Sequence, residues 1–337
     1  MIGSEVRPSI PPRRALATSP GPRIVALGGG TGLPILLHGL KTLLAPSDGQ
    51  RLTAIVTVAD DGGSSGRLRR AYRILAPGDV RNCLLALSDA PSTLASLFDF
   101  RFDGSGDVGG HSLGNLILTA LNEMEGDFTA AVSRASEILG VRGHVLPSTG
   151  DDVTLVAELM DGTVIAGESR IASGHRPIAR VRLRPETARA LPGAIDAIRA
   201  ADLIVIGAGS LYTSLLPILL VKDLGAAIAA SRARVVMVAN MMTEPGETDG
   251  YAVADFVHAI ERHAPGIHID DVLVNTGAPP VDVLARYAEA GAFPVPMEPT
   301  ALRHLGCRVW SRDLLGGGTR IAHDPEKLAQ AILELAR

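Results

Sequence analysis

The sequence predicts an α/β protein with a Rossmann-like, doubly wound and mainly parallel sheet that is interrupted by a β-rich insert. Short apolar runs alternate with segments of helical apolar spacing, as in strand–helix–strand units. Several of these runs end in loops rich in glycine and hydroxyl side chains, which is where doubly wound sheets place ligands. From about residue 144 to residue 184 the apolar spacing changes to the alternation typical of antiparallel strands.

The composition indicates how the chain is divided into domains and in which cellular compartment it is found. The chain has 337 residues, of which 46% are hydrophobic, enough to bury a core without disulfides. Residues 1–22 are rich in Pro, Ser and Arg and lack an apolar signal segment, so we expect a disordered tail followed by one nucleotide-binding domain at residues 23–337. Cys83 and Cys307 are far apart in the sequence, which predicts buried thiols in a reducing compartment and a cytoplasmic protein.

Two classes of partner are not expected. A net charge of −4 and 3% aromatic residues offer neither a basic field nor a stacking platform, so we expect no nucleic-acid partner. Residues 203–221 are uncharged and resemble a membrane span in length. Residues 207–214, a polar glycine loop, and Pro217 interrupt this stretch, so we predict a buried strand, a loop and a helix, with no membrane span.

The first strand, residues 23–27, runs into a glycine loop and a helix at residues 33–40. In the loop, Gly28 to Gly32, backbone N–H groups and the helix dipole can converge on a phosphate. The loop departs from the dinucleotide fingerprint because Leu33 or Ile35 occupies the third glycine position. We therefore predict a nucleotide phosphate here and disfavour an NAD-dependent oxidoreductase.

The second strand, residues 52–58, ends in a segment of acidic and small residues. The carboxylates of Asp60 and Asp61 can accept ribose hydroxyls or hold a divalent cation. The side chains that follow, Ser64, Ser65 and Arg67, can donate hydrogen bonds to anionic oxygen.

Helical spacing then predicts helices at residues 79–87, 91–99 and 112–124. We predict Asp79 as the N-cap of the first, which places Arg81 and Asn82 where an anion would bind. Residues 110–114 match the nucleophile elbow of serine hydrolases but lack the strand that this motif requires. Ser112 is therefore predicted as a helix N-cap, and His111 as a proton donor or a polar loop residue.

The second half of the chain repeats the strand–loop–helix pattern. A hairpin is predicted at residues 153–166, and strands at residues 203–206, 234–239 and 271–275. The loops after the first two of these strands carry Gly209, Ser210, Tyr212 and Thr213, and Asn240, Thr243, Glu247 and Thr248.

Six segments together resemble one bacterial family: GGGTGL, VTVADDGGSSGRLR, PGDVRNCLLALS, GHSLGNLIL, GAGSLYTSLLP and NMMTEPGETD. They are similar, in this order, to the gluconeogenesis factor (YvcK-like) family within the superfamily of the 2-phospho-L-lactate transferase. The resemblance covers most of the chain from Arg23 onward. It implies a Rossmann-like core that binds UDP-sugars such as UDP-N-acetylglucosamine or UDP-glucose. It also implies a role in growth on gluconeogenic carbon, peptidoglycan supply and cell shape, with no settled catalytic activity.

The leading hypothesis is a regulatory protein in which the glycine loop holds a diphosphate, Asp60 or Asp61 contacts ribose or metal, and residues 240–248 contact sugar or uracil. The alternative is a metal-dependent transferase in which Asp60 and Asp61 hold Mg²⁺. No cofactor is assigned otherwise, and we expect a homo-oligomer. The predicted ligand-binding residues are Gly28, Gly29, Gly30, Thr31, Gly32, Asp60, Asp61, Ser64, Ser65, Arg67, Arg81, Asn82, His111, Ser112, Asn115, Gly209, Ser210, Tyr212, Thr213, Asn240, Thr243, Glu247 and Thr248.

Overall fold

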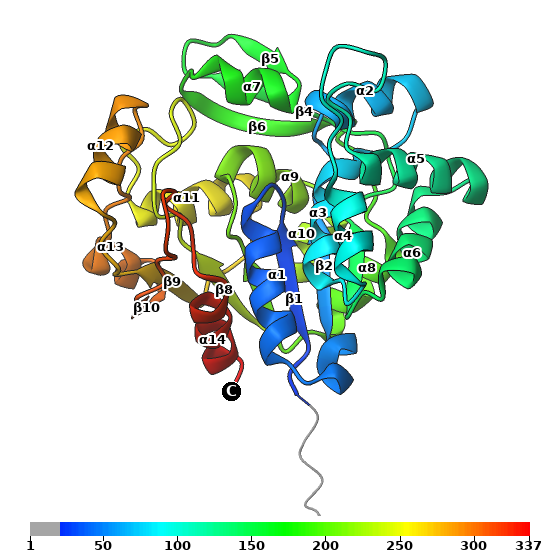
Figure 1. Ribbon diagram of the computed structural model, residues 1–337. Coiled ribbons are helices and arrows are strands. Elements are labelled where there is room, and N and C mark those ends of the chain that lie inside the picture. The colour runs from blue at the N-terminus through cyan, green and yellow to red at the C-terminus, as the bar shows by residue number, and fades with distance from the viewer. Residues whose placement is uncertain (1–20) are drawn as a thin grey trace, which may run out of the picture.

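A seven-stranded parallel sheet forms the centre of the protein in the computed structural model, which describes residues 21–337 (Figure 1). The strand order is β10–β9–β8–β7–β1–β2–β3. Residues 1–20 of the predicted tail lie outside the described residues. The strands are β1 (Ile24–Gly28), β2 (Leu52–Val56), β3 (His144–Pro147), β7 (Leu203–Ile206), β8 (Arg234–Val238), β9 (Asp271–Asn275) and β10 (Arg308–Arg312).

The order of the strands reverses between β1 and β7. From β1 the chain proceeds to β2 and β3 on one side, whereas β7 is followed by β8, β9 and β10 on the other. In open parallel sheets, the crevice at the carboxyl ends of the two strands at such a reversal is where ligands bind. The predicted doubly wound, Rossmann-like architecture is confirmed.

Helices cover both faces of the sheet. Helix α1 packs against α3 and α14 on one face, and α10 packs against α8 and α9 on the other (Figure 1). The helices are α1 (Gly32–Leu43), α2 (Gly63–Tyr72), α3 (Pro77–Leu87), α4 (Ser92–Asp99), α5 (Leu113–Glu125), α6 (Phe128–Leu139), α8 (Pro192–Ala200), α9 (Leu216–Leu219), α10 (Lys222–Ala229), α11 (Val253–His263), α12 (Val281–Glu289), α13 (Pro299–His304) and α14 (Pro325–Leu335), with a 3-10 turn at Pro46–Arg51 and a π-helical turn at Leu211–Leu215.

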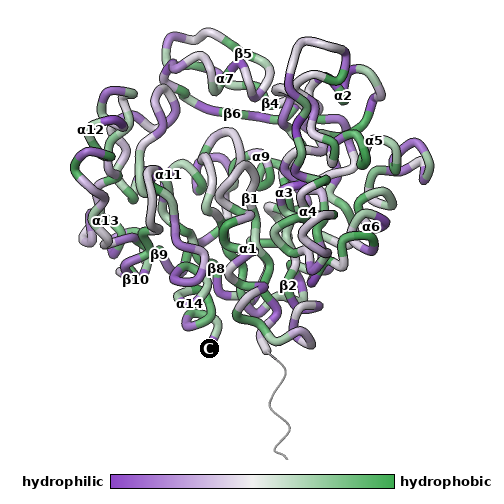
Figure 2. Tube along the Cα trace, viewed as in Figure 1, coloured by the Kyte–Doolittle hydropathy of each residue, from purple (hydrophilic) through white to green (hydrophobic). Residues whose placement is uncertain are grey.

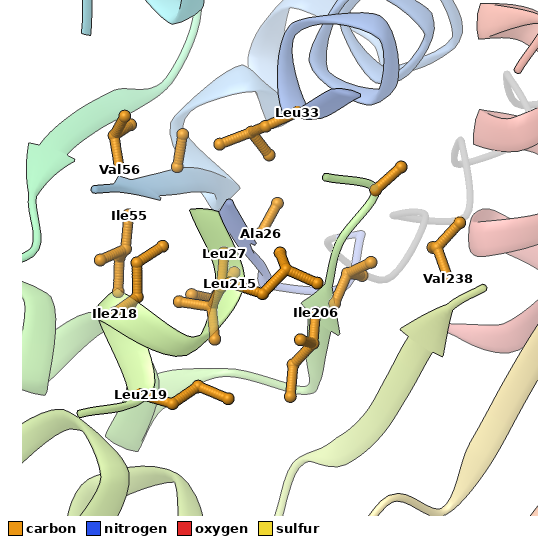
Figure 3. Packing of buried hydrophobic residues seen from close by; sticks show 14 of the residues in the cluster. Ala26, Leu27, Leu33, Ile55, Val56, Ile206, Leu215, Ile218, Leu219 and Val238 are labelled. Atoms are coloured by element: carbon orange, nitrogen blue, oxygen red, sulfur yellow. The ribbon is translucent and has the colours of Figure 1, made fainter. Parts of the chain in front are cut away.

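The core lies along the central strands. Strands β1, β2 and β7 are buried over their whole length, as expected for parallel strands covered on both faces. Hydrophobic residues follow these strands and the inner sides of the helices in Figure 2. Figure 3 shows Leu27 of β1, Ile206 of β7 and Leu215 of the π-helical turn in one cluster, so the loop after β7 is anchored in the core.

A smaller antiparallel sheet forms the insert and covers the carboxyl end of the main sheet (Figure 1). It contains β4 (Thr154–Leu159), β5 (Val164–Ala166), β6 (Ile178–Arg184) and the helix α7 (Glu168–Gly174). The predicted start near residue 144 is too early, because β3 pairs in parallel with β2. As an edge strand, β3 alternates between exposed and buried residues, which resembles the pattern of an antiparallel strand.

No single helix within residues 21–337 has the length and apolar composition that crossing a membrane requires. Leu211–Leu219 and Lys222–Ala229 meet that test only as a pair bent by 78°.

Candidate functional site

A cavity of about 260 Å³ lies at the carboxyl ends of β1, β7 and β8, where the strand order reverses. Eight of the predicted ligand-binding residues line it: Gly29, Gly30, Thr31, Gly32, Gly209, Ser210, Asn240 and Thr243. Ile35, Ala208, Ser214, Met241, Met242, Glu244, Tyr287, Ile321, Ala322 and His323 complete the wall. The position is the one expected for a ligand site in this fold.

The glycine loop is shaped by close backbone contacts. A Cβ atom on Gly32 would lie 2.4 Å from the carbonyl oxygen of Ala208, so the loops after β1 and β7 can meet only with glycine at this position. Gly30 has a φ of +59°, a conformation that favours glycine. Gly28 ends β1 and does not line the cavity.

An acidic side chain already binds this loop. The Gly30 N–H donates a hydrogen bond of 2.8 Å to Oδ2 of Asp79. Helix α3 begins at Pro77 with Ala76 at the N-cap position, so the prediction of Asp79 as the N-cap is wrong. Proline at N1 starts the helix instead. Burial raises the pKa of Asp79 to about 6, and repulsion from Asp60 adds to the rise while the Gly30 N–H opposes it.

The loop after β8 holds two carboxylates close to the cavity. Asn240 donates through Nδ2 to Glu244 Oε1 at 3.3 Å, while its own Oδ1 is buried without a partner. Glu247 is 7% exposed; its Oε1 accepts a bond from Thr213 and its Oε2 has no partner. Burial raises the pKa of Glu247 to about 8, with further contributions from Glu244 and Glu168. The pKa of Glu244 is also raised, mainly by burial, so both carboxyl groups of this loop are easier to protonate than free glutamate.

The insert forms a roof attached to loops on both sides of the cavity. Ser169 of α7 donates to Asp61 Oδ1 through its backbone N–H at 2.9 Å and through its hydroxyl at 2.7 Å. His175 Nδ1 contacts the carbonyl oxygen of Pro245 at 3.1 Å. Asp61 thus anchors the roof. The pKa of Glu168, also on α7, is raised to about 8. Burial is the main cause, and repulsion from Asp60 and other nearby acids adds to it.

A second group of predicted residues meets away from the cavity. Ser64 Oγ lies 3.0 Å from His111 Nδ1 and accepts a bond of 3.1 Å from Asn115 Nδ2. All three residues are more than nine-tenths buried. Nearby, Arg67 donates through Nη2 to the carbonyl oxygen of Gly109 at 2.8 Å. Burial, and then the charges of Arg67 and Arg101, lower the pKa of His111, which favours a neutral ring.

Several other predicted site residues have structural partners. The hydroxyl of Tyr212, a fully buried side chain, lies 2.6 Å from that of Tyr251. Ser112 occupies the predicted N-cap position of α5, but its hydroxyl bonds to Phe98 O and makes no cap bond. Thr248 Oγ1 accepts a bond from the backbone N–H of Glu244. Ser65 is buried and packs close to Gly78 at the start of α3.

Some residues at the site carry no recognisable local signal. Glu168 lies in the insert, and Ser214 lies in the π-helical turn that follows the glycine loop of β7. His323 lies just before α14; burial lowers its pKa to about 4, and its Nε2 has no partner. Only the folded chain brings these residues together.

The acidic residues do not form a complete metal site. Among residues 21–337, no group of three or more His, Cys, Asp or Glu side chains is arranged to hold a metal ion. Asp60 Oδ1 accepts a bond from Gly62 N, and Asp61 Oδ1 is bound by Ser169. A cation here would need phosphate oxygens from a ligand as additional donors, as Mg²⁺ commonly does.

Comparisons with known proteins identify the family of the chain. Residues 24–315 match the family described as 2-phospho-L-lactate transferase CofD. The chain is 46% identical over 317 residues to the gluconeogenesis factor of Bacillus subtilis, covering 94% of this chain and 98% of that protein. It is also 46% identical over 313 residues to the gluconeogenesis factor of Halalkalibacterium halodurans, covering 92% and 95%.

A solved structure of a relative has the same fold. A crystal structure of a UPF0052 family member from Bacillus halodurans superposes with a TM-score of 0.88 at 45% identity, covering 93% of this chain and 99% of that chain. The chain therefore belongs to the gluconeogenesis factor family, within the wider family of the 2-phospho-L-lactate transferase CofD.

Proposed function

We propose that the protein binds a UDP-sugar, UDP-N-acetylglucosamine or UDP-glucose, in the cavity between β1 and β7. In this proposal it is a cytoplasmic regulator of growth on gluconeogenic carbon, peptidoglycan supply and cell shape. The observation that carries the proposal is the glycine loop, whose Gly30 N–H already binds a carboxylate oxygen where the strand order reverses. A loop that binds a carboxylate also suits a phosphate oxygen.

Each part of the ligand has matching groups in the wall. Residues 29–32 and the N-terminus of α1 offer backbone N–H groups to the diphosphate, and Ser210 and Ser214 offer hydroxyls. Asn240 and Thr243 offer polar groups to the sugar or uracil, beside the apolar Met241 and Met242. A cavity with a few polar groups on an apolar wall is typical of small-molecule sites.

Calorimetric titration with UDP-N-acetylglucosamine tests the proposal, with NAD and a deazaflavin as comparators. We expect saturable binding of the UDP-sugar without turnover. Asn240→Ala should weaken it about tenfold, which corresponds to the loss of one good hydrogen bond. The matched control, Asn122→Ala on α5, should bind as the wild type does. Equal affinity in the Asn240→Ala variant would remove this loop from the site.

A second candidate function is metal-dependent transfer of a phospholactyl group to a deazaflavin. The favouring observation is the proximity of Asp60, Asp61 and Asp79 to Glu168, whose pKa they help to raise. Bound Mg²⁺ would supply charge neutralisation at a phosphate, with Asp60 and Asp61 as its protein ligands. Formation of a deazaflavin phosphodiester that requires Mg²⁺ would favour this candidate over the regulator.

We also propose a homo-oligomer. Sedimentation analysis of the purified chain tests this directly, and a single monomeric species would reject it.

A further inference from the structure

Arg81 on α3 is a buried cation with few partners. Arg81 is only 6% exposed, and its Nη2 donates a hydrogen bond of 2.5 Å to Asn82 Oδ1. Its Nε and Nη1 have no hydrogen-bond partner. Across residues 21–337 it takes part in no ion pair. A buried charge that lacks a direct ion-pair partner is unfavourable, so an anion bound at this position would stabilise it.

The side chain of Arg81 lies against the first turn of α5. A Cβ atom on Gly114 would be 2.8 Å from Arg81 Cδ. Helix α5 has 13 residues and no side-chain cap bond at its N-terminus. The Leu113 N–H donates to the carbonyl oxygen of Phe100, so the helix dipole and the N–H groups of Gly114 and Asn115 add to the attraction for an anion. The guanidinium and the helix terminus therefore act in the same place.

Asn115, in the same turn, provides a second group without a partner. It is 2% exposed, and its Oδ1 has no partner. Its Nδ2 donates to Ser64 Oγ, which in turn lies 3.0 Å from His111 Nδ1. Because Asn115 donates to this oxygen, the Ser64 hydroxyl can donate its proton to Nδ1. Ser64 and His111 thus fix the amide, and Oδ1 is left as an acceptor.

Charges of both signs lie around this turn. Arg67 and Arg101 bind the carbonyl oxygens of Gly109 and Gly110, at 2.8 Å and 2.7 Å. Burial lowers the pKa of Arg81, while the nearby Asp99 and Asp79 favour its charged form. These acids do not replace a direct partner, since no hydrogen bond links either of them to Arg81 in the described residues 21–337.

We propose that Arg81, Asn115 and the first turn of α5 form a second anion site, which binds the phosphate group of a small phosphorylated ligand. None of these residues lines the 260 Å³ cavity, so the site is separate from the proposed nucleotide site. The unpartnered nitrogens Nε and Nη1 of Arg81 donate to phosphate oxygens, and Asn115 Oδ1 accepts the proton of a P–OH group. The unpartnered atoms are not exposed, so the adjoining loop at residues 102–110, held by Arg67 and Arg101, moves as the ligand enters.

The test is a calorimetric titration with inorganic phosphate at constant ionic strength, with and without saturating UDP-N-acetylglucosamine. We expect saturable phosphate binding to the wild type that persists when the UDP-sugar occupies the glycine loop. Arg81→Met should weaken phosphate binding at least tenfold, and Asn115→Asp should do the same because it adds a repelling charge. Arg199→Met, an exposed arginine on α8, is the matched control and should not change it.

No phosphate binding by the wild type, unchanged affinity in Arg81→Met, or complete loss of phosphate binding at saturating UDP-sugar would each overturn the second site. If Arg81→Met does not fold, Asn115→Asp decides, because aspartate has nearly the same shape as asparagine. Titration of Asn115→Asp with the UDP-sugar keeps the two sites apart. Asn115 does not line the 260 Å³ cavity, so this variant should retain wild-type affinity for the UDP-sugar even when phosphate binding is lost.

Discussion

At the scale of single residues, Asp79 makes ligand binding at the glycine loop dependent on pH. Its carboxylate occupies the Gly30 N–H that a phosphate oxygen would use, and its pKa is raised to about 6. Above this pKa the charged carboxylate competes with the ligand and repels it, whereas below it the neutral acid no longer repels the ligand and is a weaker acceptor for the Gly30 N–H. We therefore predict that the affinity for a UDP-sugar rises as the pH falls from 8 to 5.5, by up to about tenfold per unit above pH 6.

Asp79→Asn tests this prediction by calorimetry across the same pH range. The variant should bind more tightly than the wild type at pH 8, and its affinity should be nearly independent of pH. Glu168 and Glu247 also titrate near the site, with pKa values raised to about 8. A pH dependence that persists in Asp79→Asn would assign the effect to those carboxyl groups instead.

At the scale of elements, the sequence predicts most accurately those strands that are buried on both faces. Residues 24–28 and 203–206 are buried on both faces and lead into glycine loops, and both predictions agree with the structure within one residue. Strand β10 was not predicted because this edge strand is half polar, with Arg308 and Arg312 at its ends. The same holds for the site. The glycine loops can be predicted from a local sequence motif, whereas His323 and Glu168 reach the site only through tertiary packing.

The contact between the two glycine loops is the next feature that can be tested. In Gly32→Ala the new methyl group would meet the backbone of Ala208 at 2.4 Å, and backbone cannot yield as a flexible side chain can. We expect a loss of about 1–3 kcal/mol in the free energy of unfolding, as for other overpacked positions, measured with urea. Gly106→Ala is the control because its Cβ would meet nothing within 4 Å. Equal stability of the two variants would show that the loops can separate.

At the scale of the whole molecule, the insert joins parts of the sheet that are far apart in the chain. It is attached after β2 through Ser169 and Asp61, after β8 through His175 and Pro245, and to α11 through the bond from Val181 N to His263 Nε2. These contacts hold the roof over the carboxyl end of the main sheet (Figure 1). A ligand held between the strand ends and the roof would stabilise all of these segments together, since binding to the folded state stabilises whatever it contacts.

We therefore predict that saturating UDP-N-acetylglucosamine slows amide hydrogen exchange in three separate segments: residues 28–32, 168–175 and 240–246. Ser169→Ala removes one of two bonds to Asp61, so it should speed exchange in α7 without ligand by about fivefold, for a local loss near 1 kcal/mol. Ser173→Ala in the same helix, whose hydroxyl bonds only within α7, is the control. Protection confined to residues 28–32 would mean that the ligand is held by the sheet alone and that the roof has no part in binding.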